Sequence, residues 1–224
     1  VVRWLDVKSD CGTRTSPHVG AGMLVGGVPY RRVDSFGEFT PRDCDSALKD
    51  GLPAEKAVVL DLRDDGGGFI DAAQNVISQF VSSGEAFETR DHAGHVERRN
   101  VTGSPPAPTL PLMVLVNANS ASASEIVAGS LAVHGRAKLV GTMTFGKGSV
   151  QQDFPLPDGS DLHLTIRHWF LPDGSSVEGK GLTPSVPAKL ASPDDMFDAS
   201  KPELGHAKDT QLNQALGLLA GGGA

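Results

Sequence analysis

The 224-residue sequence predicts an α/β fold with mixed α+β elements, organised around parallel βαβ units. Three short apolar runs, at residues 57–62, 111–116 and 137–141, have the continuous pattern of strands that are buried on both faces. Segments with the apolar spacing of a helix lie between them, at residues 69–83 and 124–135. This order of strands and helices predicts parallel strands joined by right-handed crossovers.

The remaining segments predict antiparallel strands and one further helix around this core. They comprise an exposed hairpin over 85–104, two strands over 150–156 and 160–171, and a helix over 209–220. We divide the chain into N-terminal strands over 1–35, a core over 36–200, and a C-terminal helix with a loose tail over 201–224. Within the core, residues 36–56 predict a helix and a loop.

The composition is that of an ordinary globular chain, with 39% hydrophobic and 21% charged residues. A net charge of −7 gives no cationic face, so we expect no nucleic-acid partner. No apolar run reaches the roughly 18 residues of a membrane-spanning helix. The two cysteines, Cys11 and Cys44, lack the spacing of a zinc site, and whether they form a disulfide or stay free is left open.

Two loops that follow predicted parallel strands carry runs of small residues. The triple glycine 66–68 follows the first strand, and the serines of 119–124 follow the second. Ligands of parallel sheets bind beyond the carboxyl ends of the strands, so we expect one site here.

Ser122 and Glu125 have the spacing of a capping box, in which the side chain of each residue accepts a hydrogen bond from the backbone N–H of the other. A nucleophilic Ser122 is compatible with this cap, because a helix N-terminus also offers N–H groups to an oxyanion.

A nucleophilic serine needs a base, and the sequence offers histidines or a lysine. The histidines nearest to the motifs lie in the predicted hairpin, far along the helix or in a late strand: His92, His95, His134, His163 and His168. None of them stands out as the base, so a Ser-His-Asp triad is disfavoured. Lys147 is the better candidate, because Gly146 and Gly148 flank it and allow a close backbone approach. A lysine acts as a base at neutral pH when an apolar pocket desolvates it.

The segment GTMTFGKGS also has the opening of a phosphate-binding P-loop. Gly141, Gly146 and Lys147 match its first positions. A P-loop continues with Ser or Thr and then a helix, whereas Gly148 and a predicted strand follow here. The nucleotide-binding alternative is therefore disfavoured.

Five segments in this order resemble the C-terminal processing peptidases, also called tail-specific proteases, which are serine peptidases with a Ser-Lys dyad. They are VVLDLRDDGGG, LMVLVNANSASASEIVAGSL, GTMTFGKGSVQ, LPDGSDLHLTIRHWFLPDGSSVEGKGLTPSV and the weaker DTQLNQAL, and they cover roughly residues 57 to 216. GGVPYRRVDSF resembles a diverged form of the strand that opens the family's catalytic domain. The resemblance implies a ClpP/crotonase-like βαβ core with additional antiparallel strands.

The resemblance also implies the catalytic residues. The family's nucleophile is the middle serine of SASAS, which is Ser122 here. Its general base is the lysine of TFGKG, here Lys147, which lies 25 residues downstream as in the family. A glutamine four residues after the lysine commonly orients it, and this position is Gln151. Residues 36–200 are thereby expected to form the Ser-Lys peptidase core.

The oxyanion hole implied by the resemblance combines two loops. One N–H comes from the glycine run, by position Gly68 with Gly67 beside it, and the other follows the nucleophile, at Ala123. The family's NPGG or NNGGG appears here as DDGGG. Asp64 and Asp65 add negative charge beside the expected oxyanion, which would disfavour it by Coulomb repulsion unless the carboxylates point away.

The implied activity is that of a serine endopeptidase that cleaves polypeptides near accessible C-termini, with no metal or cofactor. The resemblance places it outside the bacterial cytoplasm, in the periplasm or cell envelope, or in an organelle lumen, and it leaves a homo-oligomer open. Many members carry a PDZ domain before this region, and we recognise none in these residues. Two alternatives remain, an inactive relative that binds peptides as a scaffold and a crotonase-like acyl-CoA enzyme. The spacing of Ser122 and Lys147 argues against the second.

Overall fold

A six-stranded sheet forms the centre of the protein, and most of it is the parallel array that the sequence predicts. This computed structural model describes residues 19–24, 28–38, 40, 57–103, 105, 108–198 and 205–221. The strands in spatial order are β1 (Val19–Met23), β2 (Pro29–Val33), β3 (Val58–Asp61), β6 (Leu112–Val116), β7 (Lys138–Gly141) and β10 (Val186–Pro187). Every neighbouring pair is parallel except β1 and β2. The α/β prediction is confirmed.

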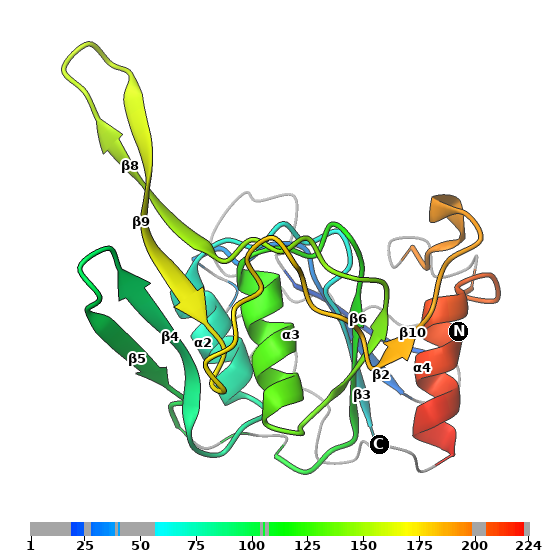
Figure 1. Ribbon diagram of the computed structural model, residues 1–224. Helices are drawn as coiled ribbons and strands as arrows, with labels where there is room; N and C mark the ends of the chain where they lie inside the picture. Colours follow the sequence, from blue (N-terminus) through cyan, green and yellow to red (C-terminus); the bar gives the residue numbers. More distant parts are fainter. Residues whose placement is uncertain are drawn as a thin grey trace, which may run out of the picture.

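Helices cover both faces of this sheet. Helices α2 (Ile70–Ser78) and α3 (Ala123–Val133) lie on one face, and α4 (Thr210–Ala220) lies on the other (Figure 1). Alternate residues of each central strand therefore enter different cores. In β3, Val58 and Leu60 pack in the cluster that contains α2 and α3, whereas Val59 packs in the cluster that contains α4. Burial on both faces explains why β3 and β6 have apolar residues at consecutive positions rather than at alternate ones.

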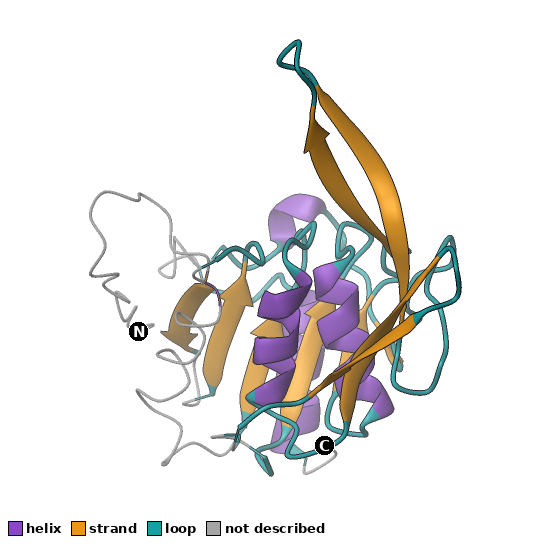
Figure 2. Cartoon of the chain, turned by 90° about the vertical axis from the view of Figure 1, so that its left-hand side faces the viewer, coloured by secondary structure: helices purple, strands orange, loops and turns teal. Residues whose placement is uncertain are grey.

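A second, antiparallel sheet lies beside α2 and α3. Its strands in spatial order are β5 (Val96–Asn100), β4 (Glu85–Asp91), β9 (Asp161–Phe170) and β8 (Ser149–Pro155). The predicted hairpin over 85–104 is present, but β4 is mostly buried rather than exposed because it also pairs with β9. The outer part of the β8–β9 hairpin extends away from the rest of the molecule (Figures 1 and 2).

The termini of the elements agree with their sequence signals. Helix α3 is followed by Gly135 with φ +64°, the left-handed conformation expected of a glycine at a helix C-terminus.

Some predictions fall outside the described residues. They are the state of Cys11 and Cys44 and nearly all of the helix and loop expected within 36–56. No helix among the described residues is long and apolar enough to cross a membrane.

Candidate active site

Three loops meet at the carboxyl edge of the parallel sheet. They follow β3, β6 and β7, which are adjacent strands, and they span residues 62–68, 117–122 and 142–148. The first contains the triple glycine, the second the serine run and the third Lys147. The structure therefore brings these motifs together beyond the strand ends, where the sequence predicts one site.

Ser122 has a strained backbone conformation at the start of α3. Its φ of 55° and ψ of −114° lie outside the regions that a residue with a side chain ordinarily occupies. Strain of this kind persists only where the surrounding structure enforces it, and it is common at functional sites. Ser122 is half-buried, and the capping box that it was expected to form with Glu125 is present at the start of α3. The helix cap and the candidate nucleophile are therefore the same residue.

The two serines that flank Ser122 have structural roles. The buried Ser120 hydroxyl donates to the Leu62 carbonyl at 2.7 Å and accepts from the Asn117 N–H at 3.0 Å. The buried Ser124 hydroxyl donates to the Asp65 carbonyl at 3.0 Å. Both hydroxyls bind the serine turn to the chain that leaves β3. The expectation that Ser120 and Ser124 are turn and helix residues agrees with these contacts.

The glycine loop touches the serine turn so closely that side chains would not fit. A Cβ at Gly67, where φ is +96°, would lie 2.6 Å from the Ala121 carbonyl oxygen and 2.9 Å from the Ser122 Cβ. A Cβ at Gly68 would lie 2.3 Å from the Phe36 carbonyl oxygen. These positions need glycine because backbone, which cannot move aside, fills the space on both sides.

The N–H groups expected to form the oxyanion hole differ in their availability. The Gly67 N–H donates to Asp65 Oδ1 at 2.8 Å, so it is already used inside the loop. Among the described residues, neither the Gly68 N–H nor the Ala123 N–H donates to a protein acceptor. Gly68 and Ala123 therefore keep the donors that an oxyanion would need.

Glu125 joins the nucleophile turn to the lysine loop. Its buried carboxylate accepts the Ser122 N–H at 3.0 Å, as the capping box requires. The same carboxylate accepts the N–H groups of Gly146 at 2.7 Å and Lys147 at 2.8 Å, and the Thr144 hydroxyl at 2.5 Å. Four donors saturate one carboxylate, which explains how a charge is tolerated at a buried position.

Further contacts fix the backbone on the other side of Lys147. The Gly148 N–H donates to Glu178 Oε2 at 2.7 Å, and the Gly179 N–H donates to the Gly146 carbonyl at 2.9 Å. The buried indole of Trp169 donates to the Lys147 carbonyl at 3.0 Å. The lysine loop is therefore bound to α3, β9 and the 178–179 turn at once.

The side chains of the expected dyad are not hydrogen-bonded to one another in this structure. No hydrogen bond joins Ser122 Oγ to Lys147 Nζ within the described part of the chain, although Glu125 brings their backbones together. Gln151 lies in β8, is exposed, and pairs across the hairpin with Thr165. None of the described contacts links it to Lys147.

The carboxylates of DDGGG take two different directions. Asp64 is exposed, and its Oδ1 accepts from the side-chain amides of Asn117 and Asn119, both at 2.8 Å. Asp65 is fully buried beneath the glycine loop. The Asp64 carboxylate therefore binds the two exposed asparagine amides, while the Asp65 carboxyl group is buried.

The alternatives weighed against Lys147 fail on geometry. Residues 142–148 form a loop that leads into strand β8, so the P-loop alternative is wrong. His134 binds the Glu85 carbonyl at 2.8 Å, His95 pairs with Asp91, and His163 pairs with Asp153. These histidines are held by groups that lie outside the three site loops.

The comparisons with known proteins agree with this geometry. The sequence profile of peptidase family S41 matches residues 27–188, which is more than half of the chain. The chain belongs to peptidase family S41. The matched residues of this S41 chain include all three site loops and the strands that carry them.

Curated relatives of the S41 chain are named as C-terminal processing proteases. The carboxy-terminal-processing protease of Bartonella bacilliformis is 36% identical, and the alignment covers 88% of this chain and 52% of the relative. The carboxy-terminal processing protease CtpB of Bacillus subtilis is 30% identical, with 83% of this chain and 38% of the relative covered. The chain spans about half the length, or less, of these relatives.

Solved structures show the same fold. The photosystem II D1 C-terminal processing protease has a TM-score of 0.67 and 31% identity, with 75% of this chain and 45% of that chain covered. A putative S41 protease from Bacteroides fragilis has a TM-score of 0.71 and 22% identity, with 91% of this chain and 57% of that chain covered. At that lower identity the likeness concerns the fold alone.

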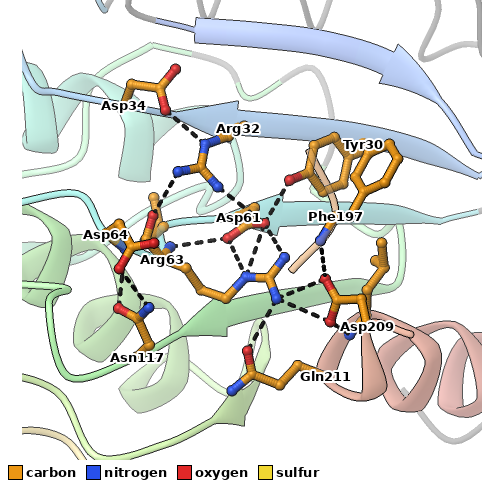
Figure 3. A network of polar contacts seen from close by, with 12 residues as sticks. Tyr30, Arg32, Asp34, Asp61, Arg63, Asp64, Asn117, Phe197, Asp209 and Gln211 are labelled. Atoms are coloured by element: carbon orange, nitrogen blue, oxygen red, sulfur yellow. Dashed lines mark hydrogen bonds and ion pairs between the residues drawn. The ribbon is translucent and has the colours of Figure 1, made fainter. Parts of the chain in front are cut away.

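A buried polar network joins the loop after β3 to the start of α4 (Figure 3). Arg63, which directly precedes Asp64, is fully buried and binds Asp61 with contacts as short as 2.6 Å. Its other end reaches Asp209 at 2.9 Å and Gln211 at 3.0 Å, at the start of α4. Burial acts to raise the pKa of Asp61, but Arg63, together with Arg32 and the Tyr30 hydroxyl, outweighs it and holds that pKa below its usual value.

Sequence reasoning did not anticipate the Arg63 network or the contacts of Glu125 with the lysine loop. Arg63 is two residues from Asp61, but its other partner, Asp209, follows it by 146 residues. Glu125 carried a local signal, the capping box, but that signal does not name Gly146 or Lys147 as partners. The available hint was an acidic residue at the third position of a helix whose other residues are small or apolar.

Proposed function

We propose that this chain is the catalytic part of a serine endopeptidase that cleaves polypeptides near their C-termini. Ser122 is the nucleophile and Lys147 the general base. The observation that carries the proposal is the Glu125 carboxylate, which accepts the backbone N–H groups of both Ser122 and Lys147. Membership of family S41 and the names of the curated relatives support the reaction class.

The reaction starts with attack of Ser122 Oγ on a peptide carbonyl carbon while neutral Lys147 accepts the hydroxyl proton. Lys147 then gives this proton to the leaving amine, and the C–N bond breaks to leave an acyl-enzyme. Water, deprotonated by Lys147, attacks the ester carbonyl carbon. The bond from that carbon to Ser122 Oγ then breaks, the acid leaves, and Lys147 returns its proton to Ser122 Oγ. Gln151 would hold the lysine side chain, which requires that the start of the hairpin bring its amide inward.

The tetrahedral intermediate carries a negative oxygen that the Gly68 and Ala123 N–H groups would bind. Each donor of this kind contributes on the order of 3 kcal/mol to transition-state stability. The Ser122 and Lys147 side chains must also approach to hydrogen-bonding distance, and catalytic hydrogen bonds often tighten only when substrate binds.

Three exposed apolar side chains surround the proposed site. Phe69 follows the glycine loop and is 64% exposed, while Met143 and Phe145 on the lysine loop are 54% and 65% exposed. Large apolar groups exposed together beside a catalytic group are typical of a binding surface. We propose that they contact apolar side chains of the polypeptide substrate.

The test is cleavage of an unstructured peptide by Ser122→Ala and Lys147→Ala, with Lys189→Ala as an exposed-lysine control. We expect both site variants to lose at least about 1,000-fold in kcat and the control to match the wild type. Near-normal turnover by Lys147→Ala would exclude the dyad. Cleavage products identified by mass spectrometry would show whether the cut lies near the C-terminus.

The missing Ser122–Lys147 hydrogen bond favours one second candidate, an inactive relative that binds peptides as a scaffold. Such a protein would bind the peptide with unchanged affinity in all variants, show no cleavage, and leave Ser122 unlabelled by a fluorophosphonate. Labelling of the wild type but not of Lys147→Ala would reject it. We also propose an extracytoplasmic location, which fractionation of the producing cell would test.

A further inference from the structure

Asp65 is a buried acid at the centre of the loops that form the proposed site. It follows β3 by four residues and lies two residues before Gly67, and its side chain is fully buried. The dyad mechanism assigns it no role. Burial of a carboxyl group without a cationic partner is costly, so its presence at this position calls for an explanation.

The contacts of Asp65 all lead to the oxyanion loop and the nucleophile turn. Its Oδ1 accepts the Gly67 N–H at 2.8 Å, and its carbonyl accepts the Ala121 N–H and the Ser124 hydroxyl, both at 3.0 Å. These three bonds connect Asp65 with Gly67 in its own loop, and with Ala121 and Ser124, which precede and follow Ser122. Asp65 therefore sets how the two halves of the oxyanion hole face each other.

The second carboxyl oxygen of Asp65 has no partner. Oδ2 is buried and accepts no hydrogen bond from any described residue. An ionised carboxylate would leave half of its charge unsolvated there, whereas a neutral carboxyl group would not. Burial accordingly raises the pKa of Asp65 to about 7, and the Gly67 N–H and the nearby Ser124 hydroxyl oppose this only in part.

The charged groups of neighbouring elements do not neutralise Asp65. Arg32 of β2 lowers the pKa of Asp65 and Asp34 raises it, and these two residues are paired with each other at 2.7 Å. Glu125 of α3 is saturated by its own four donors, and Asp64 binds two asparagine amides. A neutral Asp65 thus remains the form that fits its surroundings.

We propose that Asp65 is a positioning residue that supports catalysis in its neutral form and lowers activity when it ionises. This inference rests on the proposed function. The neutral carboxyl group keeps the Gly67 N–H engaged and places no charge beside Gly68. Ionisation puts a negative charge in the loop that must bind the oxyanion, and repulsion between the two raises the barrier to acylation.

The experiment compares pH profiles of kcat/KM for peptide cleavage from pH 5 to 10. We expect the wild type to lose on the order of tenfold on an alkaline limb that reports ionisation of Asp65. Asp65→Asn has the same shape, keeps an acceptor for the Gly67 N–H and stays neutral, so its profile should lack that limb. Asp65→Ala removes the acceptor, so its activity should be low at every pH.

Asp64→Asn is the matched control, because it removes the same charge one residue earlier and keeps an oxygen for Asn117 and Asn119. Its profile should have the shape of the wild type. An Asp65→Asn profile identical to the wild type in a cleaving enzyme would overturn the inference and leave the proposed function intact. Absence of any Ser122-dependent cleavage in the wild type would overturn both.

A direct titration covers the case in which Asp65→Asn does not fold. The 13C resonance of the Asp65 carboxyl carbon in the wild type, assigned by backbone connectivity, should titrate with a midpoint near 7, well above the roughly 4 of a free aspartate. A midpoint near 4 would show an ionised Asp65 across the working range and would refute the neutral role.

Discussion

Ser122 illustrates how strongly single positions are specified in this site. Its backbone angles cost energy, and three separate groups hold it: Glu125 takes its N–H, the Ser124 hydroxyl binds the preceding loop, and Gly67 packs against its Cβ. Replacement of any neighbour that enforces this conformation should therefore affect catalysis before it affects the fold.

Gly67 and Gly66 offer the sharpest test at the residue scale. In Gly67→Ala the new Cβ would lie 2.6 Å from the Ala121 carbonyl oxygen at a φ of +96°, so the serine turn must move. We expect turnover to fall on the order of 100-fold, because displacement of about 1 Å is enough for that loss. Gly66→Ala is the control, since nothing lies within 4 Å of its Cβ. Equal kcat values for the two variants would contradict the close-packing argument.

Asp65 also makes the stability of the protein depend on pH. Its folded pKa of about 7 is higher than the roughly 3.9 of an unfolded aspartate, so the folded state binds the proton more tightly. The free energy of unfolding should therefore fall as pH rises from about 4 to 7, by at most about 4 kcal/mol from this group.

Asp65→Asn should remove this pH dependence and stabilise the protein at pH 8 relative to the wild type. Urea unfolding of both proteins at pH 4.5 and pH 8 measures the effect. A difference between them that is the same at both pH values would mean that Asp65 titrates normally.

At the scale of elements, the parallel core was predictable and the loop contacts were not. Strands β3, β6 and β7 are apolar at nearly every position because both faces are covered, and this pattern is local. Strand β10 comprises only Val186 and Pro187, and two residues are too few to form a pattern that predicts a strand.

The candidate site was predictable for a different reason. Family resemblance marked Ser122, Lys147 and the glycine run from the spacing of short motifs. Residues that bind the loops of the candidate site, such as Trp169, or that lie in them, such as Arg63, make contacts over long sequence separations that no motif encodes. Periodicity would also place Arg63, a charge after a buried strand, at the surface, whereas it is fully buried.

The junction between helix α3 and the lysine loop depends on an acceptor at Glu125. In Glu125→Gln the amide nitrogen replaces one oxygen, and each oxygen of the carboxylate faces at least one backbone N–H. Either orientation of the amide therefore opposes donor to donor. We expect kcat to fall on the order of 100-fold and the free energy of unfolding to fall by roughly 3 kcal/mol.

Glu178→Gln is the matched control for Glu125→Gln. Its carboxylate accepts one backbone N–H, from Gly148, and an amide oxygen can replace that acceptor. We expect unfolding free energy within about 1 kcal/mol of the wild type. Measurement of kcat and of urea unfolding for both variants tests this difference. A Glu125→Gln protein with the same kcat as Glu178→Gln would show that the position of the lysine loop does not depend on Glu125.

At the scale of the whole molecule, the Arg63 network joins the two faces of the sheet. Arg63 comes from the loop after β3, beside the proposed site, while Asp209 and Gln211 belong to α4 on the opposite face (Figure 3). Asp209 also caps α4 by accepting the Leu212 N–H at 2.9 Å, and it binds the Phe197 N–H at 2.9 Å. Helix α4 is thus held to the parallel sheet by ion pairs as well as by apolar packing.

Asp209→Ala should destabilise the protein strongly because it leaves one end of the buried Arg63 guanidinium without its carboxylate. Removal of one partner of a buried ion pair costs about 3–5 kcal/mol, and loss of the helix cap adds to this. Asp194→Ala removes an exposed carboxylate at the same net change in charge, so a change within about 0.5 kcal/mol is expected. Urea unfolding followed by circular dichroism measures both variants. A free energy of unfolding of Asp209→Ala within 1 kcal/mol of the wild type would mean that α4 does not depend on this network.

Arg63 lies three residues before Gly66 in the loop after β3, so peptide cleavage by folded Asp209→Ala should also fall. An unchanged kcat would show that the network stabilises the fold without positioning the site.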